Sequence, residues 1–126
     1  MSASELQRLV EVMDRLRSPG GCPWDAEQTH ESLIKYLLEE SYEFIDSVDA
    51  KDREGMREEL GDVLLQVYSH ARMAQDHPTD PFTIEDVARG IADKLIRRHP
   101  HVFENLEVSG TQEIIANWEE IKAKEK

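Results

Sequence analysis

The sequence predicts an all-α protein, and three observations lead to that prediction. Apolar residues recur at spacings of three and four along most of the chain, which is the pattern of amphipathic helices. Clusters of proline, glycine and short polar residues interrupt this pattern at 18–21 and 76–81. No stretch shows the strict alternation of apolar and polar residues that indicates a β-strand. We therefore expect helices joined by loops.

Length and charge restrict the organisation and the partners. A chain of 126 residues forms one domain with a single core, which we expect to span 1–126. Charged residues make up 33% of the chain and the net charge is −12. This acidic balance argues against binding to nucleic acid and to an anionic membrane surface.

Location is predicted from what the sequence lacks. The only cysteine is Cys22, so no intramolecular disulfide can form, as is usual in a reducing compartment. The first residues show no signal-peptide pattern, and no apolar run approaches the roughly 18 residues that span a bilayer. These features predict a cytoplasmic protein.

The first helix is expected over 4–17, where Ser4 and Gln7 can form a capping box. The breaker cluster at 18–21 ends it, and an irregular segment containing Trp24 follows. Trp24 has two interpretations, which the residues alone do not separate. It either plugs the end of a helix bundle or covers a bound planar group, with Gln28, Thr29 or His30 as hydrogen-bonding groups.

Two longer helices are expected over about 29–49 and 53–75, joined by a short polar turn and therefore antiparallel. Glu40 falls in the apolar stripe of the first, where a simple bundle has no use for a carboxylate. The face expected to be buried on the second comprises Met56, Leu60, Val63, Leu64, Val67, Ala71 and Ala74. Gly61 costs on the order of 1 kcal/mol in a helix, and we expect it to allow close approach of a neighbour or ligand.

A fourth helix is expected to begin at Thr83, which with Asp86 forms a capping box, and to end at Pro100. Its end is strongly basic. The basic or imidazole side chains there are Lys94, Arg97, Arg98, His99 and His101, and we call the first four of them the basic cluster. One or two such charges complement the helix dipole, but this many indicate a binding site for anions.

The last helix is expected from Ser109, capped with Gln112, to the C-terminus. Trp118 and Lys122 are one turn apart and share a face of this helix. Most tryptophans in such positions simply pack against a neighbouring element.

Four carboxylates are the candidate metal ligands of the sequence. Each of the two central helices has an acid-x-x-acid pair in an apolar run, and the four residues are Glu40, Glu43, Glu59 and Asp62. Residues three apart share a helix face, so an antiparallel pair of helices can bring all four together. Single acidic runs are most often solvated surface, but the repetition on adjacent helices favours a metal site.

Ligands that are all carboxylates favour Mg²⁺, or Mn²⁺ as a substitute, over Zn²⁺ or Cu²⁺. Glu39 and Glu58 add charge at the rim, as further ligands or as a base. A Mg²⁺ site of this kind usually serves phosphate chemistry, and the basic cluster supplies groups to grip a polyphosphate. The parts suit hydrolytic phosphoryl or nucleotidyl transfer. No Gly-rich phosphate loop is present, so a kinase-like or ATPase-like activity has no support.

The same residues resemble a known family, the MazG nucleoside triphosphate pyrophosphohydrolases. The acidic signature spans Glu39 to Asp62, and further similar segments cover 21–25, 28–30, 94–103 and 117–122. The acidic signature alone is shared with all-α dimeric dUTPases and phosphoribosyl-ATP pyrophosphohydrolases, whereas the other segments resemble MazG. The chain resembles the N-terminal copy of two-domain members, in some of which only one copy is active.

The resemblance implies an all-α fold with a four-helix-bundle core, completed by dimerisation. It implies Mg²⁺-dependent cleavage of a nucleoside triphosphate between its α and β phosphates. It assigns the metal to Glu40, Glu43, Glu59 and Asp62, with Glu39 adjacent. It assigns the substrate to Lys94, Arg98, Trp118, Lys122 and, on the base side, Trp24, Gln28 and His30, and the basic cluster adds Arg97 and His99.

Two alternatives remain open at this point. One is a narrower enzyme that acts on dUTP or a phosphoribosyl nucleotide. The other is a helical regulatory or interaction domain that binds nucleotide without turnover, which the presence of all four acids disfavours. A surplus of apolar helix surface in so short a chain separately predicts association with a second copy.

Overall fold

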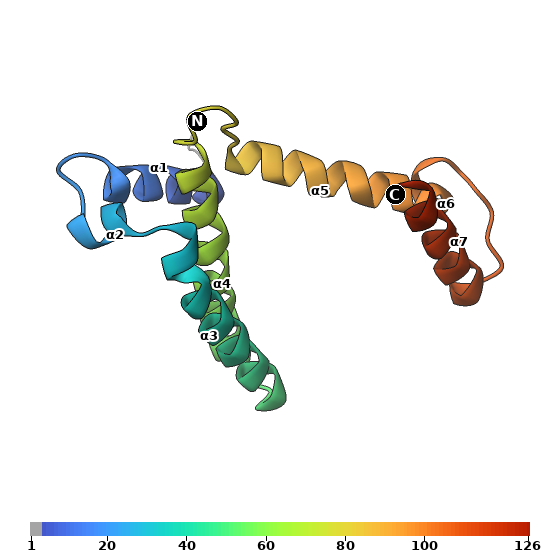
Figure 1. Cartoon of the computed structure of the whole chain (residues 1–126). Helices are drawn as coiled ribbons and strands as arrows, with labels where there is room; N and C mark the ends of the chain where they lie inside the picture. The colour runs from blue at the N-terminus through green and yellow to red at the C-terminus, as the bar shows by residue number, and fades with distance from the viewer. Residues whose placement is uncertain (1–3) are drawn as a thin grey trace. The chain divides into compact units, whose positions relative to one another are not determined.

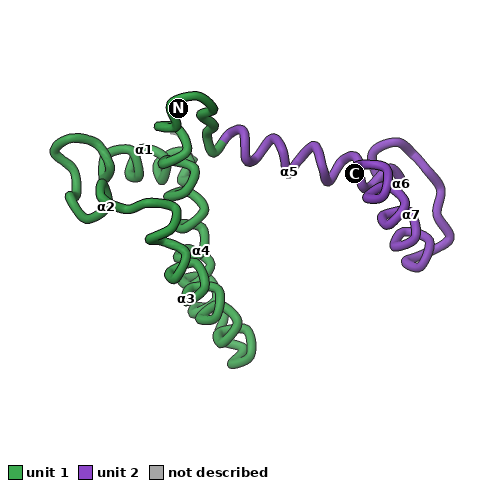
Figure 2. The backbone as a smooth tube through the Cα atoms, viewed as in Figure 1, with its two compact units in different colours: residues 1–84 green, residues 85–126 purple. Residues whose placement is uncertain are grey.

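The computed structural model describes residues 4–126, and over this range it is helical with no strand. It separates into two compact units, residues 1–84 and 85–126 (Figure 2), which are described in turn. The helices are α1 (Glu5–Arg17), α2 (Pro23–Glu27), α3 (His30–Asp49), α4 (Arg53–Ala74), α5 (Ile84–Arg98), α6 (Pro100–Phe103) and α7 (Thr111–Lys124) (Figure 1). The all-α prediction is confirmed.

The first unit is built on an antiparallel hairpin of α3 and α4, with α1 lying across the C-terminal half of α4 (Figure 1). Its core lies where these helices meet. The buried apolar side chains are Met13, Leu33, Tyr68, Ala71, Met73 and Ala74.

Local capping explains where the helices of the hairpin begin. Thr29 and Ser32 form a reciprocal capping box at the start of α3. The Asp52 carboxylate accepts from the Gly55 amide at the start of α4. At α1, the Ser4 hydroxyl accepts from the Gln7 amide, as the sequence predicted.

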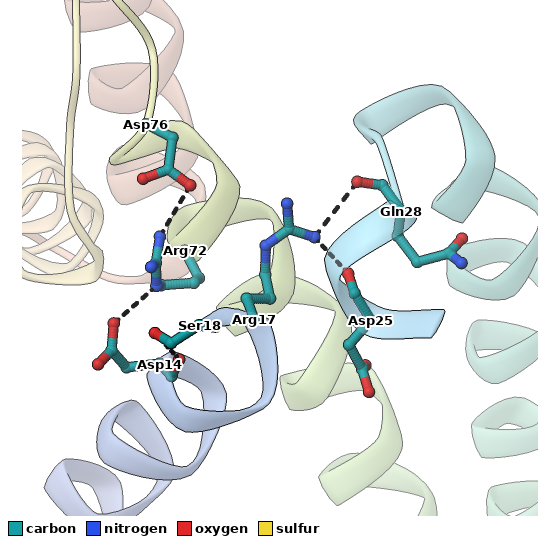
Figure 3. Close-up of polar contacts among 7 residues, drawn as sticks. All are labelled: Asp14, Arg17, Ser18, Asp25, Gln28, Arg72 and Asp76. Atoms are coloured by element: carbon teal, nitrogen blue, oxygen red, sulfur yellow. Dashed lines mark hydrogen bonds and ion pairs between the residues drawn. The ribbon is translucent and has the colours of Figure 1, made fainter. Parts of the chain in front are cut away.

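The segment around Trp24 is not an irregular loop, contrary to the prediction. It forms the short helix α2, with Pro23 at its first turn, where the fixed φ of proline suits a helix and its missing N–H is not needed. Arg17 holds this helix against the end of α1 by donating to the carbonyl oxygens of Asp25 (2.6 Å) and Gln28 (3.2 Å) (Figure 3). Arg72 of α4 likewise pairs with Asp14 of α1 at 3.0 Å (Figure 3).

Much of the hairpin surface that was expected to be buried is exposed in the single chain. Leu60 and Val67 of α4 are 51% and 39% exposed. On α3, Leu38 and Ile45 are also exposed, whereas Leu33 is buried. Within the first unit, α1 covers only one end of the hairpin, and no other described helix of this unit packs on the end near the interhelical turn.

The second unit contains most of α5, followed by α6 and α7. Pro100 ends α5 and starts α6, a second case of proline in a first turn. The start of α7 differs from the prediction, because Gly110 rather than Ser109 is its N-cap. The amide and hydroxyl of Ser109 instead donate to the Glu113 carboxylate at 2.7 and 2.8 Å, and these bonds lower the pKa of Glu113.

No described helix combines the length and the apolar character required of a membrane-spanning segment.

Candidate metal centre and nucleotide site

The α3–α4 hairpin brings side chains together in pairs along its length. Glu43 lies beside Glu59, and Glu40 lies beside Asp62 one turn further from the interhelical turn, so that each pair can share a hydrogen bond when one carboxyl is protonated. At the far end, the Nδ1 atoms of His30 and His70 lie 2.7 Å apart. This register places Tyr36 opposite Gln66, directly after the Glu40–Asp62 pair.

Three of the four predicted carboxylates converge closely. Glu40, Glu43 and Glu59 each offer an oxygen, and these oxygens lie within 4.8 Å of one another. Asp62 lies beside Glu40 and extends this group to four carboxylates. Glu39 is near enough for its charge to raise the pKa of Glu40. We call these four residues, Glu40, Glu43, Glu59 and Asp62, the acid cluster.

The acid cluster holds its protons more tightly than free carboxylates do. Loss of water contact, the hydrogen bond to Glu43 and the neighbouring negative charges raise the pKa of Glu59 from 4.5 to about 7. The pKa of Glu40 is also raised, first by desolvation and then by the charges of Asp62, Glu43 and Glu39. Burial first, and then the mutual repulsion of the carboxylates, disfavours the charged form of both groups.

The donor set fits a hard divalent cation. The Oε2 atoms of Glu40 and Glu59 are buried, and neither has a hydrogen-bond partner among the described residues. Buried polar atoms of native proteins are nearly always paired, and a bound cation would give these two oxygens the partner that they lack. The cluster contains only carboxylate oxygens, which suits Mg²⁺ or Mn²⁺.

We expect the metal-free protein to lose stability as the pH rises from about 4.5 to about 7. Over this interval folded Glu59 keeps a proton that the unfolded chain has released, so the folded state binds more protons and the free energy of unfolding falls with pH. Urea unfolding in EDTA at pH 5 and pH 7.5 measures this slope.

Two controls identify the source of that slope. Glu59→Gln should flatten it, because glutamine cannot ionise. Saturating Mg²⁺ should restore stability at pH 7.5, because it binds the folded state. A slope that is unchanged by Glu59→Gln would show that the acid cluster does not cause it.

The expected base-side residues lie beside the hairpin. Trp24 packs edge-on against Tyr36, with ring centroids 6.0 Å apart, and remains 51% exposed. Both ends of the Gln28 amide are occupied, since Nε2 donates to the Trp24 carbonyl and Oε1 accepts from the Ser32 hydroxyl, each at 2.8 Å. Gln28 therefore fixes α2 to the start of α3.

Gln66 is a candidate that the sequence reasoning missed. It is buried in α4 and lines a cavity together with Glu40 and Tyr36. A signal was available, because Glu59, Asp62 and Gln66 follow one another at helical spacing on a single face.

The other predicted substrate residues lie in the second unit. Arg97 and Arg98 both pair with Glu125, at 2.6 and 2.9 Å, which lowers the pKa of Glu125 to about 2. The His99 ring packs edge-on against Trp118, with centroids 5.3 Å apart.

Further along α7, the indole Nε1 of Trp118 is buried without a hydrogen-bond partner in the described part of the chain. Lys122 lies 3.7 Å from Glu119, and Lys94 is exposed on α5.

Gly61 makes no close contact with a neighbouring helix of the chain, and its approach to a ligand stays a prediction. A Cβ added there would meet no atom within 4 Å in the described structure, so no close approach within the chain requires glycine.

The fold and the acid cluster define a class, the all-α domains that carry paired carboxylates on a helical hairpin. Comparison with known proteins identifies the family within it. Residues 28–103 match the MazG nucleotide pyrophosphohydrolase domain, and the chain belongs to that family of hydrolases.

Three comparisons give the extent of the similarity. The nucleoside triphosphate pyrophosphohydrolase/pyrophosphatase MazG of Thermotoga maritima is 53% identical over 95% of this chain and 45% of its own length. The nucleoside triphosphate pyrophosphohydrolase of Escherichia coli K12 is 44% identical over 98% of this chain and 46% of its own. The crystal structure of a mazG-related protein from Thermotoga maritima superposes with a TM-score of 0.74 at 29% identity, covering 93% of this chain and 98% of that one.

The chain spans about half of the length of these two curated relatives.

Proposed function

We propose that this domain hydrolyses nucleoside triphosphates between the α and β phosphates, giving a nucleoside monophosphate and pyrophosphate, with Mg²⁺ as the cofactor and Mn²⁺ as a substitute. The observation that carries the proposal is the acid cluster, whose buried unpaired oxygens call for a cation. Names of similar proteins, such as nucleoside triphosphate pyrophosphohydrolase, agree with this reaction.

In this proposal Glu40, Glu43, Glu59 and Asp62 hold the cation. A bound divalent cation supplies positive charge that stabilises the negative charge developing on the phosphates and acidifies the attacking water. Glu39, exposed at the edge of the cluster, accepts the proton that this water loses. Water adds to phosphorus as the bridging P–O bond breaks, and pyrophosphate leaves.

In the same proposal the basic cluster binds the triphosphate. Lys94, Arg97, Arg98 and His99 offer cationic or hydrogen-bonding groups for the leaving phosphates. Arg97 and Arg98 must exchange Glu125 for phosphate oxygens when substrate binds. Trp118 and Lys122 complete this set of binding residues on α7.

Pyrophosphate release tests the proposal. Folded protein should release pyrophosphate and the matching monophosphate from at least one of a panel of canonical and damaged nucleoside triphosphates when Mg²⁺ is present, and release none in EDTA. Substrate recovered intact after binding would instead support a regulatory domain. Hydrolysis confined to dUTP or a phosphoribosyl nucleotide would support the narrower enzyme.

We also propose that a second copy of the chain covers the exposed apolar surface of the hairpin. Large apolar residues that are 45–56% exposed lie on both of its helices, at Ile34, Leu38, Ile45, Val48 and Leu60. Exposed apolar surface of this extent commonly marks an interface. Light scattering at micromolar concentration should report a dimer, and Leu38→Glu should give a monomer. A wild-type monomer would contradict this assembly.

A cytoplasmic location remains a prediction from the sequence.

A further inference from the structure

A cavity lies beside the acid cluster, between α2 and the hairpin. Its volume is about 200 Å³, and Glu40 is part of its wall, so the cavity adjoins the acid cluster directly. Trp24, Tyr36 and Gln66 line the same cavity.

Gln66 is the unexplained polar group of this cavity. Its side chain is only 6% exposed, and its Oε1 is buried with no donor among the described residues. Two of its polar neighbours are satisfied, because the Ser69 hydroxyl donates to the Leu65 carbonyl at 2.7 Å and the Gln28 amide is bonded at both ends.

Arg17 Nε and Glu40 Oε2, which belong to the same lining, are buried without a partner among the described residues, as Gln66 Oε1 is. Glu40 belongs to the acid cluster and Arg17 holds α2 through another nitrogen, so Gln66 is the unpaired neutral group of the lining.

A buried amide oxygen without a donor is destabilising, and such atoms in native proteins usually pair with water or a ligand. The position of Gln66 favours a ligand. It lies one helical turn from Asp62 and directly across the hairpin from an aromatic ring, Tyr36.

The volume and the lining of the cavity also restrict the size and the chemistry of the ligand. Its volume is below the roughly 300–1,000 Å³ that encloses whole drug-sized ligands, so it suits a single ring system. The rings of Trp24 and Tyr36 offer apolar surface to a planar group, and the free acceptor of Gln66 requires a hydrogen-bond donor.

We propose that this cavity takes the nucleobase of the substrate and that the Gln66 amide accepts a hydrogen bond from the exocyclic amine of that base. The inference deepens the proposed hydrolysis and rests on it, because a triphosphate held at the acid cluster places its base nearby. Gln66 is then a residue that determines which bases are accepted.

Deleting one amine from the base tests this pairing. The substrates are ATP against purine riboside triphosphate, and CTP against pyrimidin-2-one riboside triphosphate, since each analogue lacks only the exocyclic amine. In the wild-type protein, loss of the amine should lower kcat/KM at least about tenfold for one of the two pairs. In Gln66→Met, which keeps the length of the side chain but cannot accept the bond, the ratio for that pair should approach one.

Gln7→Met, at an exposed glutamine of α1, is the matched control and should keep the wild-type ratio. If Gln66→Met lowers kcat/KM by the same factor for the amine-bearing substrate and its analogue, Gln66 has a positioning role and the proposal is overturned. If Gln66→Met changes neither the two kcat/KM values nor their ratio, Gln66 pairs with a structural water only, and the proposal is likewise overturned.

A binding measurement keeps this inference separate from the proposed function. Calorimetry with the four corresponding monophosphates reports the same ratios of affinity without turnover. Two results together would contradict the proposed hydrolysis and support the base site. They are that no triphosphate is hydrolysed, and that the monophosphates bind with an affinity that depends on the amine in the wild type but not in Gln66→Met. If hydrolysis occurs without an amine effect, the base site fails alone.

Discussion

Glu59→Gln and Glu40→Gln are each expected to lower turnover of the best triphosphate by more than about 100-fold, because groups that merely support metal ligands already contribute about 10–100-fold. Glutamine preserves the shape of the side chain but removes the negative charge that attracts the cation. Rates of pyrophosphate release with saturating Mg²⁺ measure the effect.

Stability separates this loss from misfolding. In EDTA at pH 7.5 both variants should unfold at the same or higher urea concentration than the wild type, since the desolvation and the repulsion that raise the pKa of Glu59 and Glu40 are relieved when the charge is removed. Glu54→Gln, at an exposed acid in the first turn of α4, should keep full activity. Wild-type turnover in Glu59→Gln would remove the acid cluster from the mechanism.

Gly21→Ala is expected to lower the free energy of unfolding by about 2–4 kcal/mol, because the new Cβ has no room. It would lie 2.1 Å from the Arg15 carbonyl oxygen and 2.6 Å from that of Leu16. These are backbone atoms, so relief requires opening the turn that joins α1 to α2. Urea denaturation measures the change.

The adjacent glycine provides a matched comparison. Gly20 has a φ of +87° but nothing within 4 Å of an added Cβ, so Gly20→Ala should cost only the backbone strain of about 1–2 kcal/mol. If Gly21→Ala proved no more destabilising than Gly20→Ala, the close turn at the end of α1 would be contradicted.

The helices of the hairpin could be predicted because their signals are local. Thr29 and Asp52 stand at the caps, and apolar spacing carries each helix between its ends. The acid-x-x-acid spacing likewise placed the carboxylates on facing surfaces, and the structure brings Glu40, Glu43 and Glu59 together. Whether these residues hold a metal stays a prediction.

The rest depends on information that spacing does not contain. α2 is too short for a periodic pattern, so only Pro23 at its start indicated a helix. Leu60 is exposed in the single chain although the spacing predicted burial, because apolar spacing defines a face but does not say which neighbour covers it. Spacing puts Gln66 on the face of Glu59 and Asp62, but that it lines a cavity with Tyr36 follows from the pairing of two helices, which neither helix specifies alone.

Titration of the protein with Mn²⁺, followed by electron paramagnetic resonance in the presence and absence of a non-hydrolysable nucleoside triphosphate, tests the central claim most directly. We predict stoichiometric binding to the wild type that is lost in Glu59→Gln and Glu40→Gln and kept in Glu54→Gln. Absence of Mn²⁺ binding by folded wild-type protein with nucleotide present, or binding unchanged by both glutamine variants, would contradict the assignment of the acid cluster as a metal site.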